Sequence, residues 1–196
     1  MKSQRIFAYL LTPTLCVFLI LWGTQAFSQP EKSAAKGGIA AKGERLVKTA
    51  GCADCHSPKL FTEKGPQPDP NRFLAGSPAD FKLPEVPAGL IAPNKWGAVT
   101  TNDMTAWVGP WGVSFAANLT PDKETGIGSW TKEMFRTTIR SGKIHTGARD
   151  ILPPMPWAGY ANFNDAELDA IFDYLMSLKP ISNQVPQPIP PKGGGH

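Results

Sequence analysis

Apolar residues recur at helical spacing in three stretches of the chain. In the first, residues 38–50, the apolar positions are Ile39, Leu46 and Val47. Gly51 follows directly and is a residue that can end a helix. The pattern therefore predicts a helix over residues 38–50.

The second and third stretches also carry capping signals. Thr131 can cap a helix that ends at Gly142. Asn164 is an N-cap residue with Glu167 three residues on, as in a capping box, and Pro180 limits this last helix. The apolar positions are Met134, Phe135 and Ile139 in the second stretch and Leu168, Ile171, Phe172, Leu175 and Leu178 in the third. Both stretches are predicted helices.

The rest of the chain shows no sustained period. Its 20 Pro and 19 Gly make up about a fifth of the 196 residues, above the roughly 12% of average usage. Residues 57–128 are expected to form long ordered loops with at most one short helix, and residues 181–196 a flexible Pro/Gly-rich tail. No alternating run is long enough to predict a strand, so the expected fold class is all-α.

The N-terminal residues have the layout of a signal peptide. Two basic residues precede an apolar run over residues 6–22, and the small residues Ala26 and Ser28 suit the −3 and −1 positions of a cleavage site. We therefore expect residues 1–28 to be a signal peptide and residues 29–37 a linker. The alternative is an uncleaved membrane anchor, because an apolar run of 17 residues is at the lower edge of spanning length.

Cleavage changes both the charge and the cysteine count. It removes two basic and no acidic residues, so the formal net charge falls from +4 to +2. The remaining basic residues are scattered, which gives no basis for nucleic-acid binding. Cleavage also removes Cys16 and leaves Cys52 and Cys55, which an exported protein carries into an oxidising compartment.

The two remaining cysteines belong to the sequence Cys52-Ala53-Asp54-Cys55-His56. This C-x-x-C-H motif is the attachment signature of c-type haem. Two thiols three positions apart can add to the two vinyl groups of one porphyrin, and the adjacent His56 then places a ring nitrogen on the iron. We therefore expect one covalently attached haem c, held by Cys52, Cys55 and His56.

Two other chemistries compete for this motif. A dithiol redox site needs only C-x-x-C, but it usually follows a strand in a βαβ unit, and the setting predicted here is a helix followed by a loop. A zinc site needs a fourth ligand beyond Cys52, Cys55 and His56, and the remaining histidines are His145 and His196. We favour haem over both.

The opposite side of the iron needs a second axial ligand, and Met and His are the usual ones. Met155 lies between Pro154 and Pro156, which stiffen the backbone that presents its thioether. The alternatives are Met104, which lies in an irregular stretch, and His145 or an open position. We predict Met155.

Two aromatic residues follow Met155 closely. Trp157 and Tyr160 pack on the edge of such a haem, donate to a propionate, or belong to an aromatic core.

The sequence resembles class I c-type cytochromes, especially the monohaem domains found as subunits or partners of bacterial dehydrogenases. The resemblance covers about residues 38–180. It rests on the C-x-x-C-H motif and on Asn118-Leu119-Thr120-Pro121-Asp122, Gly126-Ile127-Gly128-Ser129-Trp130, Arg140-Ser141-Gly142 and Pro154-Met155-Pro156. It implies first and last helices that cross beside the haem, a thioether-bonded cysteine pair, and His56 and Met155 as axial ligands. The long segment at about residues 60–117 departs from compact members of the family.

The predicted function is electron transfer by an exported carrier or subunit, not an enzyme. With both axial positions filled, the iron binds no substrate and exchanges electrons in an outer-sphere reaction. The expected partners are a dehydrogenase or other donor and a respiratory acceptor, in the periplasm, with membrane association only if the N-terminal segment is retained. The alternative is a haem enzyme or ligand sensor with an open or displaceable sixth iron position.

Overall fold

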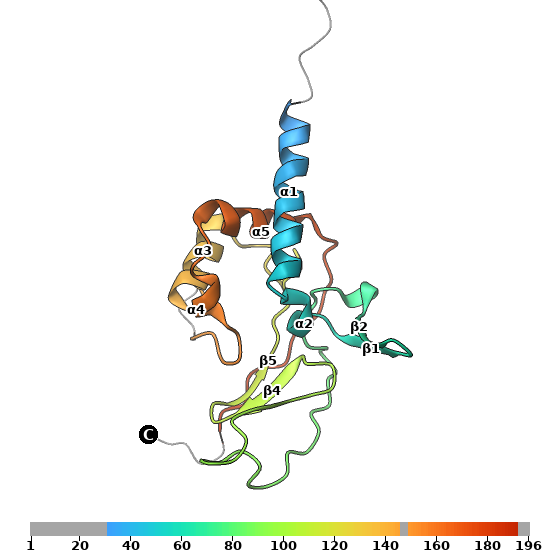
Figure 1. Ribbon diagram of the computed structural model, residues 1–196, viewed down its shortest axis with the longest axis vertical. Coiled ribbons are helices and arrows are strands. Elements are labelled where there is room, and N and C mark those ends of the chain that lie inside the picture. The colour runs from blue at the N-terminus through green and yellow to red at the C-terminus, as the bar shows by residue number, and fades with distance from the viewer. Residues whose placement is uncertain (1–30, 146–148, 192–196) are drawn as a thin grey trace, which may run out of the picture.

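The computed structural model describes residues 31–145 and 149–191 (Figure 1). The predicted signal peptide and the last residues of the predicted tail lie outside these ranges. The elements in chain order are α1 (Glu31–Thr49), α2 (Cys52–His56), β1 (Lys59–Thr62), β2 (Gly65–Pro68), η1 (Pro70–Arg72), β3 (Val99–Thr100), β4 (Ala106–Gly109), β5 (Gly112–Phe115), α3 (Lys132–Ser141), α4 (Trp157–Tyr160) and α5 (Asp165–Ser177). Among these described helices, none is long and apolar enough to cross a membrane.

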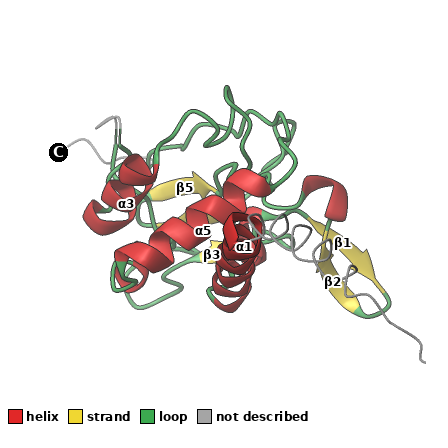
Figure 2. Ribbon diagram, turned by 90° about the horizontal axis from the view of Figure 1, so that it is seen from above, coloured by secondary structure: helices red, strands yellow, loops and turns green. Residues whose placement is uncertain are grey.

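Helices α1 and α5 cross in close contact (Figures 1 and 2), and Gly43 of α1 lies against the backbone of α5. A side-chain methyl group at Gly43 would collide with the backbone carbonyl of Ala170 and would lie 2.8 Å from Cβ of Tyr174. Only a residue without a side chain allows the two backbones to come this close. The crossing of first and last helices that the resemblance implied is present.

The main hydrophobic core lies where α1, α3 and α5 meet. Its buried members are Leu46, Val47, Leu74, Ile127, Phe135, Ile139, Leu168, Ile171, Phe172 and Leu175. Most of the apolar positions predicted from helical spacing are therefore core residues. Ile39 and Met134 are exceptions, with 47% and 36% of their surface exposed.

The ends of α3 and α5 are fixed by the predicted capping residues. The Thr131 hydroxyl accepts a hydrogen bond from the backbone N–H of Met134 at 3.2 Å, and Gly142 ends α3 with a φ of 69°. At the start of α5, Asn164 and Glu167 each accept a hydrogen bond from the other's backbone N–H at 3.0 Å. Both sets of capping predictions are confirmed.

A ladder of ion pairs joins α3 to α5. Basic residues recur every fourth position along α3 and acidic residues recur every fourth position along α5, so that the two rows face each other. The pairs are Lys132–Asp173 at 2.7 Å, Arg136–Asp169 at 2.8 Å and Arg140–Asp165 at 2.6 Å.

The prediction of a purely all-α fold is wrong in part, because residues 59–115 contain two small antiparallel sheets. Strand β1 pairs with β2 (Figure 1), and β4 lies between β3 and β5. These strands have two or four residues each, too few for an alternating pattern to emerge from the sequence. Gly65 and Gly112 supply the positive φ, 91° and 92°, at the turns.

The first helix begins earlier than predicted. Helix α1 starts at Glu31, so most of the predicted linker at residues 29–37 is helical in the structure. Alanines in this stretch favour helix and extend the helix that was expected from residue 38.

The segment that follows α5 also differs from the prediction, because its described part is held in place. Ile189 and Val113 exchange two backbone hydrogen bonds, at 2.7 and 3.0 Å. The Asn183 side chain donates to the carbonyls of Ala75 and Ser77 at 2.7 and 2.8 Å. These bonds offset the flexibility that the Pro and Gly content predicted for residues 181–191.

Candidate functional site

The C-x-x-C-H motif forms its own short helix, α2, directly after α1. Gly51 separates the two helices with a left-handed φ of 69°. Cys52 and Cys55 are three residues apart and therefore neighbours on one side of a single helical turn. Both thiols are free and partly buried.

The His56 ring is buried and oriented by one backbone group. Its Nδ1 lies 2.7 Å from the carbonyl oxygen of Ala117. Because a carbonyl oxygen only accepts hydrogen bonds, Nδ1 carries the proton and Nε2 keeps its lone pair. Burial lowers the pKa of His56, which favours the neutral ring. A neutral imidazole whose second nitrogen is fixed in this way is the form that binds a metal.

Ala117 ends the long segment, and beside His56 this end contacts residues 76 and 77 of the same segment. The N–H of Gly76 donates to the His56 carbonyl at 2.8 Å, and the N–H of Ser77 donates to the Ala116 carbonyl at 2.9 Å. Gly76 has a φ of 80°, and a Cβ there would lie 2.5 Å from the Ala116 oxygen. The long segment therefore helps to hold the His56 ring.

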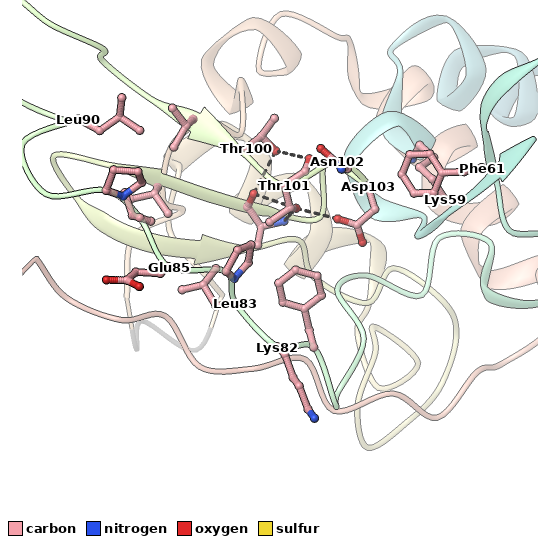
Figure 3. A pocket seen from close by; sticks show the side chains of 17 residues that line it. Lys59, Phe61, Lys82, Leu83, Glu85, Leu90, Thr100, Thr101, Asn102 and Asp103 are labelled. Carbon is pink, nitrogen blue, oxygen red and sulfur yellow. Dashed lines mark hydrogen bonds between the residues drawn. The ribbon is translucent and has the colours of Figure 1, made fainter.

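Lys59 closes the C-terminal end of α2. Its Nζ donates to the carbonyls of Ala53, Asp54 and Ser57 at 2.9, 2.8 and 2.6 Å. Cations are favourable at this end of a helix, although partial burial lowers the pKa of Lys59. Lys59 also lines a hollow of about 650 Å³ that is formed by β1, by residues 81–87 and by β3 and β4 with the turn between them (Figure 3).

The two thiols lack the property that a redox pair needs. Burial raises the pKa of Cys52 to about 11 and also raises the pKa of Cys55. Both groups are thiols rather than thiolates at neutral pH, whereas dithiol redox sites react through a thiolate of lowered pKa. Across residues 31–145 and 149–191, no group of three or more His, Cys, Asp and Glu side chains could hold a metal ion.

Met155 lies in the irregular segment between α3 and α4. Its side chain is partly buried and packs against the main core, as does that of Cys52. The Met155 carbonyl accepts a hydrogen bond from the N–H of Trp157 at 2.9 Å. The Trp157 ring in turn covers Gly142, where a side-chain methyl group would collide with it.

The two alternative candidates for the second iron ligand, Met104 and His145, lie in different environments from Met155. Met104 lies in the turn between β3 and β4, with a φ of 60°, and its carbonyl accepts a hydrogen bond from Trp107 Nε1 at 2.9 Å. His145 packs edge-on against Trp130 with ring centroids 4.3 Å apart. Its Nδ1 is buried without a hydrogen-bond partner among the described residues.

One hydrogen bond joins the segment after Met155 to the segment before Cys52. The Tyr160 hydroxyl donates to the Ala50 carbonyl at 2.6 Å. Ala50 precedes α2 and Tyr160 ends α4, so the bond fixes these short helices relative to each other. From the sequence, Tyr160 was expected either to pack in a core or to donate a hydrogen bond to a haem propionate. No sequence signal indicated a backbone carbonyl as its hydrogen-bond acceptor.

The residues present fit a covalently held haem c. They supply two free thiols on one turn, a neutral imidazole with an available Nε2, and a thioether that packs on the same core.

Comparison with known proteins gives cytochrome relatives over most of the chain. The chain is 26% identical to the gluconate 2-dehydrogenase cytochrome c subunit of Pantoea cypripedii over 179 residues, 88% of this chain and 32% of that protein. It is 26% identical to the fructose dehydrogenase cytochrome subunit of Gluconobacter japonicus over 189 residues, 94% of this chain and 31% of that protein. Both relatives are cytochrome subunits of dehydrogenases.

A shorter match is closer in sequence. Over 76 residues, 38% of this chain, the identity to the cytochrome c subunit of a quinone-dependent alcohol dehydrogenase of Gluconobacter oxydans is 36%, and the match covers 16% of that protein. The chain thus spans about a third or less of the length of these relatives. No family model matches the chain.

Proposed function

We propose that the chain is an exported monohaem c-type cytochrome that transfers electrons from a dehydrogenase to a respiratory acceptor. The observation that carries this proposal is the α2 turn, which combines two free thiols with a His56 ring whose Nδ1 is bonded to Ala117. The single C-x-x-C-H motif supports one haem. The relatives named as dehydrogenase cytochrome subunits support a dehydrogenase as donor.

Four side chains would hold the haem. Cys52 and Cys55 would each add an S–H across one vinyl group, with the sulfur bonded to one carbon and the proton to the other. His56 would bind the iron through Nε2, and Met155 would bind it through its sulfur. A c-type haem, when bound, supplies an iron that takes up and gives off one electron.

The remaining residues keep this donor set in place and away from water. The Ala117 carbonyl fixes the His56 tautomer, and Lys59 fixes the end of the turn that carries both cysteines. The buried hydrophobic core on which Met155 packs keeps water away from the inner side of that residue. With His56 and Met155 both bound to the iron, no position would remain for a substrate, so we infer an electron carrier rather than a catalytic subunit.

Export follows from the proposed signal peptide and places the protein in the periplasm. Cleavage after residue 28 would remove the leader, and retention of the leader would anchor the protein to the membrane. Electron-transfer partners usually dock over modest areas, which suits a subunit that exchanges electrons with more than one protein.

Mass spectrometry of the protein exported by a host that matures c-type cytochromes tests the proposal. We expect the mass of the chain without residues 1–28 plus one haem. Cys52→Ala and Cys55→Ala are expected to prevent stable two-point attachment, whereas Cys16→Ala, which changes the third cysteine, is the matched control and should leave the haem increment unchanged. A wild-type protein that matures without any haem increment would overturn the proposal.

A further inference from the structure

The Tyr160–Ala50 hydrogen bond connects residues 110 positions apart in the sequence. Ala50 lies between α1 and the α2 turn, and Tyr160 is the last residue of α4, which begins two positions after Met155. The bond therefore spans the two segments that carry the proposed iron ligands.

The hydroxyl of Tyr160 is placed by its ring. The ring is partly buried against the main core and stacks on Phe163, with centroids 6.1 Å apart and an interplanar angle of 13°. Burial raises the pKa of Tyr160, so its hydroxyl keeps the proton that it donates. The acceptor, the Ala50 carbonyl, lies at the C-terminal end of α1, where helix carbonyls lack partners within the helix.

The backbone between Met155 and Tyr160 is short and internally bonded. The N–H of Trp157 donates to the Met155 carbonyl at 2.9 Å, and the N–H of Tyr160 approaches the Pro156 carbonyl at 3.4 Å. A displacement of Tyr160 relative to Ala50 is thereby passed on to Met155.

Other contacts hold the Met155 segment to different parts of the molecule. The Ser114 hydroxyl donates to the Pro153 carbonyl at 2.6 Å, which ties the segment to β5. The Trp157 ring ties it to Gly142 at the end of α3. Neither contact reaches the α2 turn, whereas the Tyr160 hydroxyl is bonded directly to the residue before Gly51.

We infer that Tyr160 is a positioning residue, whose hydrogen bond to Ala50 sets the Met155 thioether relative to the Cys52–His56 turn. This inference rests on the proposed function, because it concerns the binding of the Met155 sulfur to a haem iron. Tyr160 itself binds neither the iron nor a substrate.

Competition by imidazole for the iron of the ferric holoprotein tests the inference. Tyr160→Phe keeps the ring and removes one buried hydrogen bond, so we expect imidazole to displace the thioether at about fivefold lower concentration than in the wild type. The control is Tyr174→Phe, because Tyr174 is also half-buried and its hydroxyl has no hydrogen bond within the described residues. The control is expected to keep wild-type imidazole affinity.

Several outcomes would overturn the inference. One is a Tyr160→Phe protein that melts at a lower temperature but keeps wild-type imidazole affinity, because the bond would then serve stability alone. Another is an equal change in both Tyr variants. If Tyr160→Phe yields no folded holoprotein, Phe163→Leu is tested instead, because it loosens the packing of the Tyr160 ring and keeps the hydroxyl. We then expect imidazole to displace the thioether at about twofold lower concentration than in the wild type. An unchanged imidazole concentration would overturn the inference.

Failure of the proposed function has a different signature. A wild-type ferric protein without the methionine-to-iron charge-transfer band contradicts both Met155 ligation and the positioning role of Tyr160. A wild-type protein with that band, beside a Tyr160→Phe protein of unchanged imidazole affinity, contradicts the positioning role alone.

Discussion

The helices and the long segment at about residues 60–117 are held together by different interactions. Helices α1, α3 and α5 share a side-chain core and an ion-pair ladder. The long segment has short hairpins, glycine turns and backbone hydrogen bonds, and its C-terminal end at Ala117 lies against Gly76. The site draws on both regions, because the helical part carries Cys52 and Cys55 while Ala117 of the long segment orients His56. Substitutions in the helical part should therefore alter the site through the position of the two cysteines, and substitutions in the long segment should alter it through the orientation of His56.

The largest effect is expected at the helix crossing. Gly43→Ala places a methyl group against the Ala170 carbonyl and should reduce the free energy of unfolding by about 3 kcal/mol. Gly38→Ala is the matched control in the same helix, because no atom lies within 4 Å of its Cβ position. The control should raise stability by about 0.5–1 kcal/mol. Denaturant unfolding measures both, and equal effects would contradict a close crossing at Gly43.

The next largest effect is expected where the long segment meets His56. Gly76→Ala combines a φ of 80° with a clash at the Ala116 carbonyl, and should cost about 2 kcal/mol. Gly65→Ala has a φ of 91° in open space, so it should cost about 1 kcal/mol from backbone strain alone. Only Gly76→Ala should also alter the haem absorption spectrum. An unchanged spectrum would show that the segment does not orient His56.

A smaller effect is expected at the end of the α2 turn. Lys59→Met removes three hydrogen bonds to backbone carbonyls and should lower the free energy of unfolding by about 1.5 kcal/mol. Lys82→Met removes a lysine from the same hollow (Figure 3), and the Lys82 side chain has no hydrogen bond within the described residues. Both variants lose one positive charge, but only Lys59→Met loses hydrogen bonds, so thermal unfolding should show a lower melting temperature for Lys59→Met than for Lys82→Met. Equal destabilisation would exclude the capping role of Lys59.

The smallest effect is expected on the ion-pair ladder and depends on pH. The hydrogen bond from Arg140 lowers the pKa of the Asp165 carboxyl. A carboxyl with a lowered folded pKa stabilises the fold above its unfolded pKa of about 4, and this stability is lost as the pH falls through the folded value. Asp165→Asn should therefore be less stable than wild type at pH 6, with a difference that narrows on acidification below pH 4. A difference that is constant with pH would contradict the pairing.

Local signals made part of this fold predictable. Asn164 and Glu167 lie three residues apart, so a capping box can be recognised from neighbouring residues alone. The C-x-x-C-H motif is equally local, because one helical turn holds all of its side chains. Strands of two to four residues in a Gly- and Pro-rich stretch lack such a signal, and the two sheets were missed for that reason.

Contacts between distant segments were not predictable from the sequence. The partner of His56 Nδ1 is the backbone carbonyl of Ala117, 61 residues away, and a backbone oxygen leaves no trace in residue type. The partner of Tyr160 is likewise a carbonyl. Gly76 offered an indirect signal, because glycine is the residue that permits a positive φ where two backbones approach closely.

The most direct test of the account asks which region supplies the second iron ligand. The methionine-to-iron charge-transfer band of the ferric protein would be recorded for the wild type, for Met155→Leu and for Met104→Leu. We predict that the band is present in the wild type, absent in Met155→Leu and unchanged in Met104→Leu. Met104 lies in the β3–β4 turn of the long segment. A band that survives in Met155→Leu, or that disappears in Met104→Leu, would contradict the account.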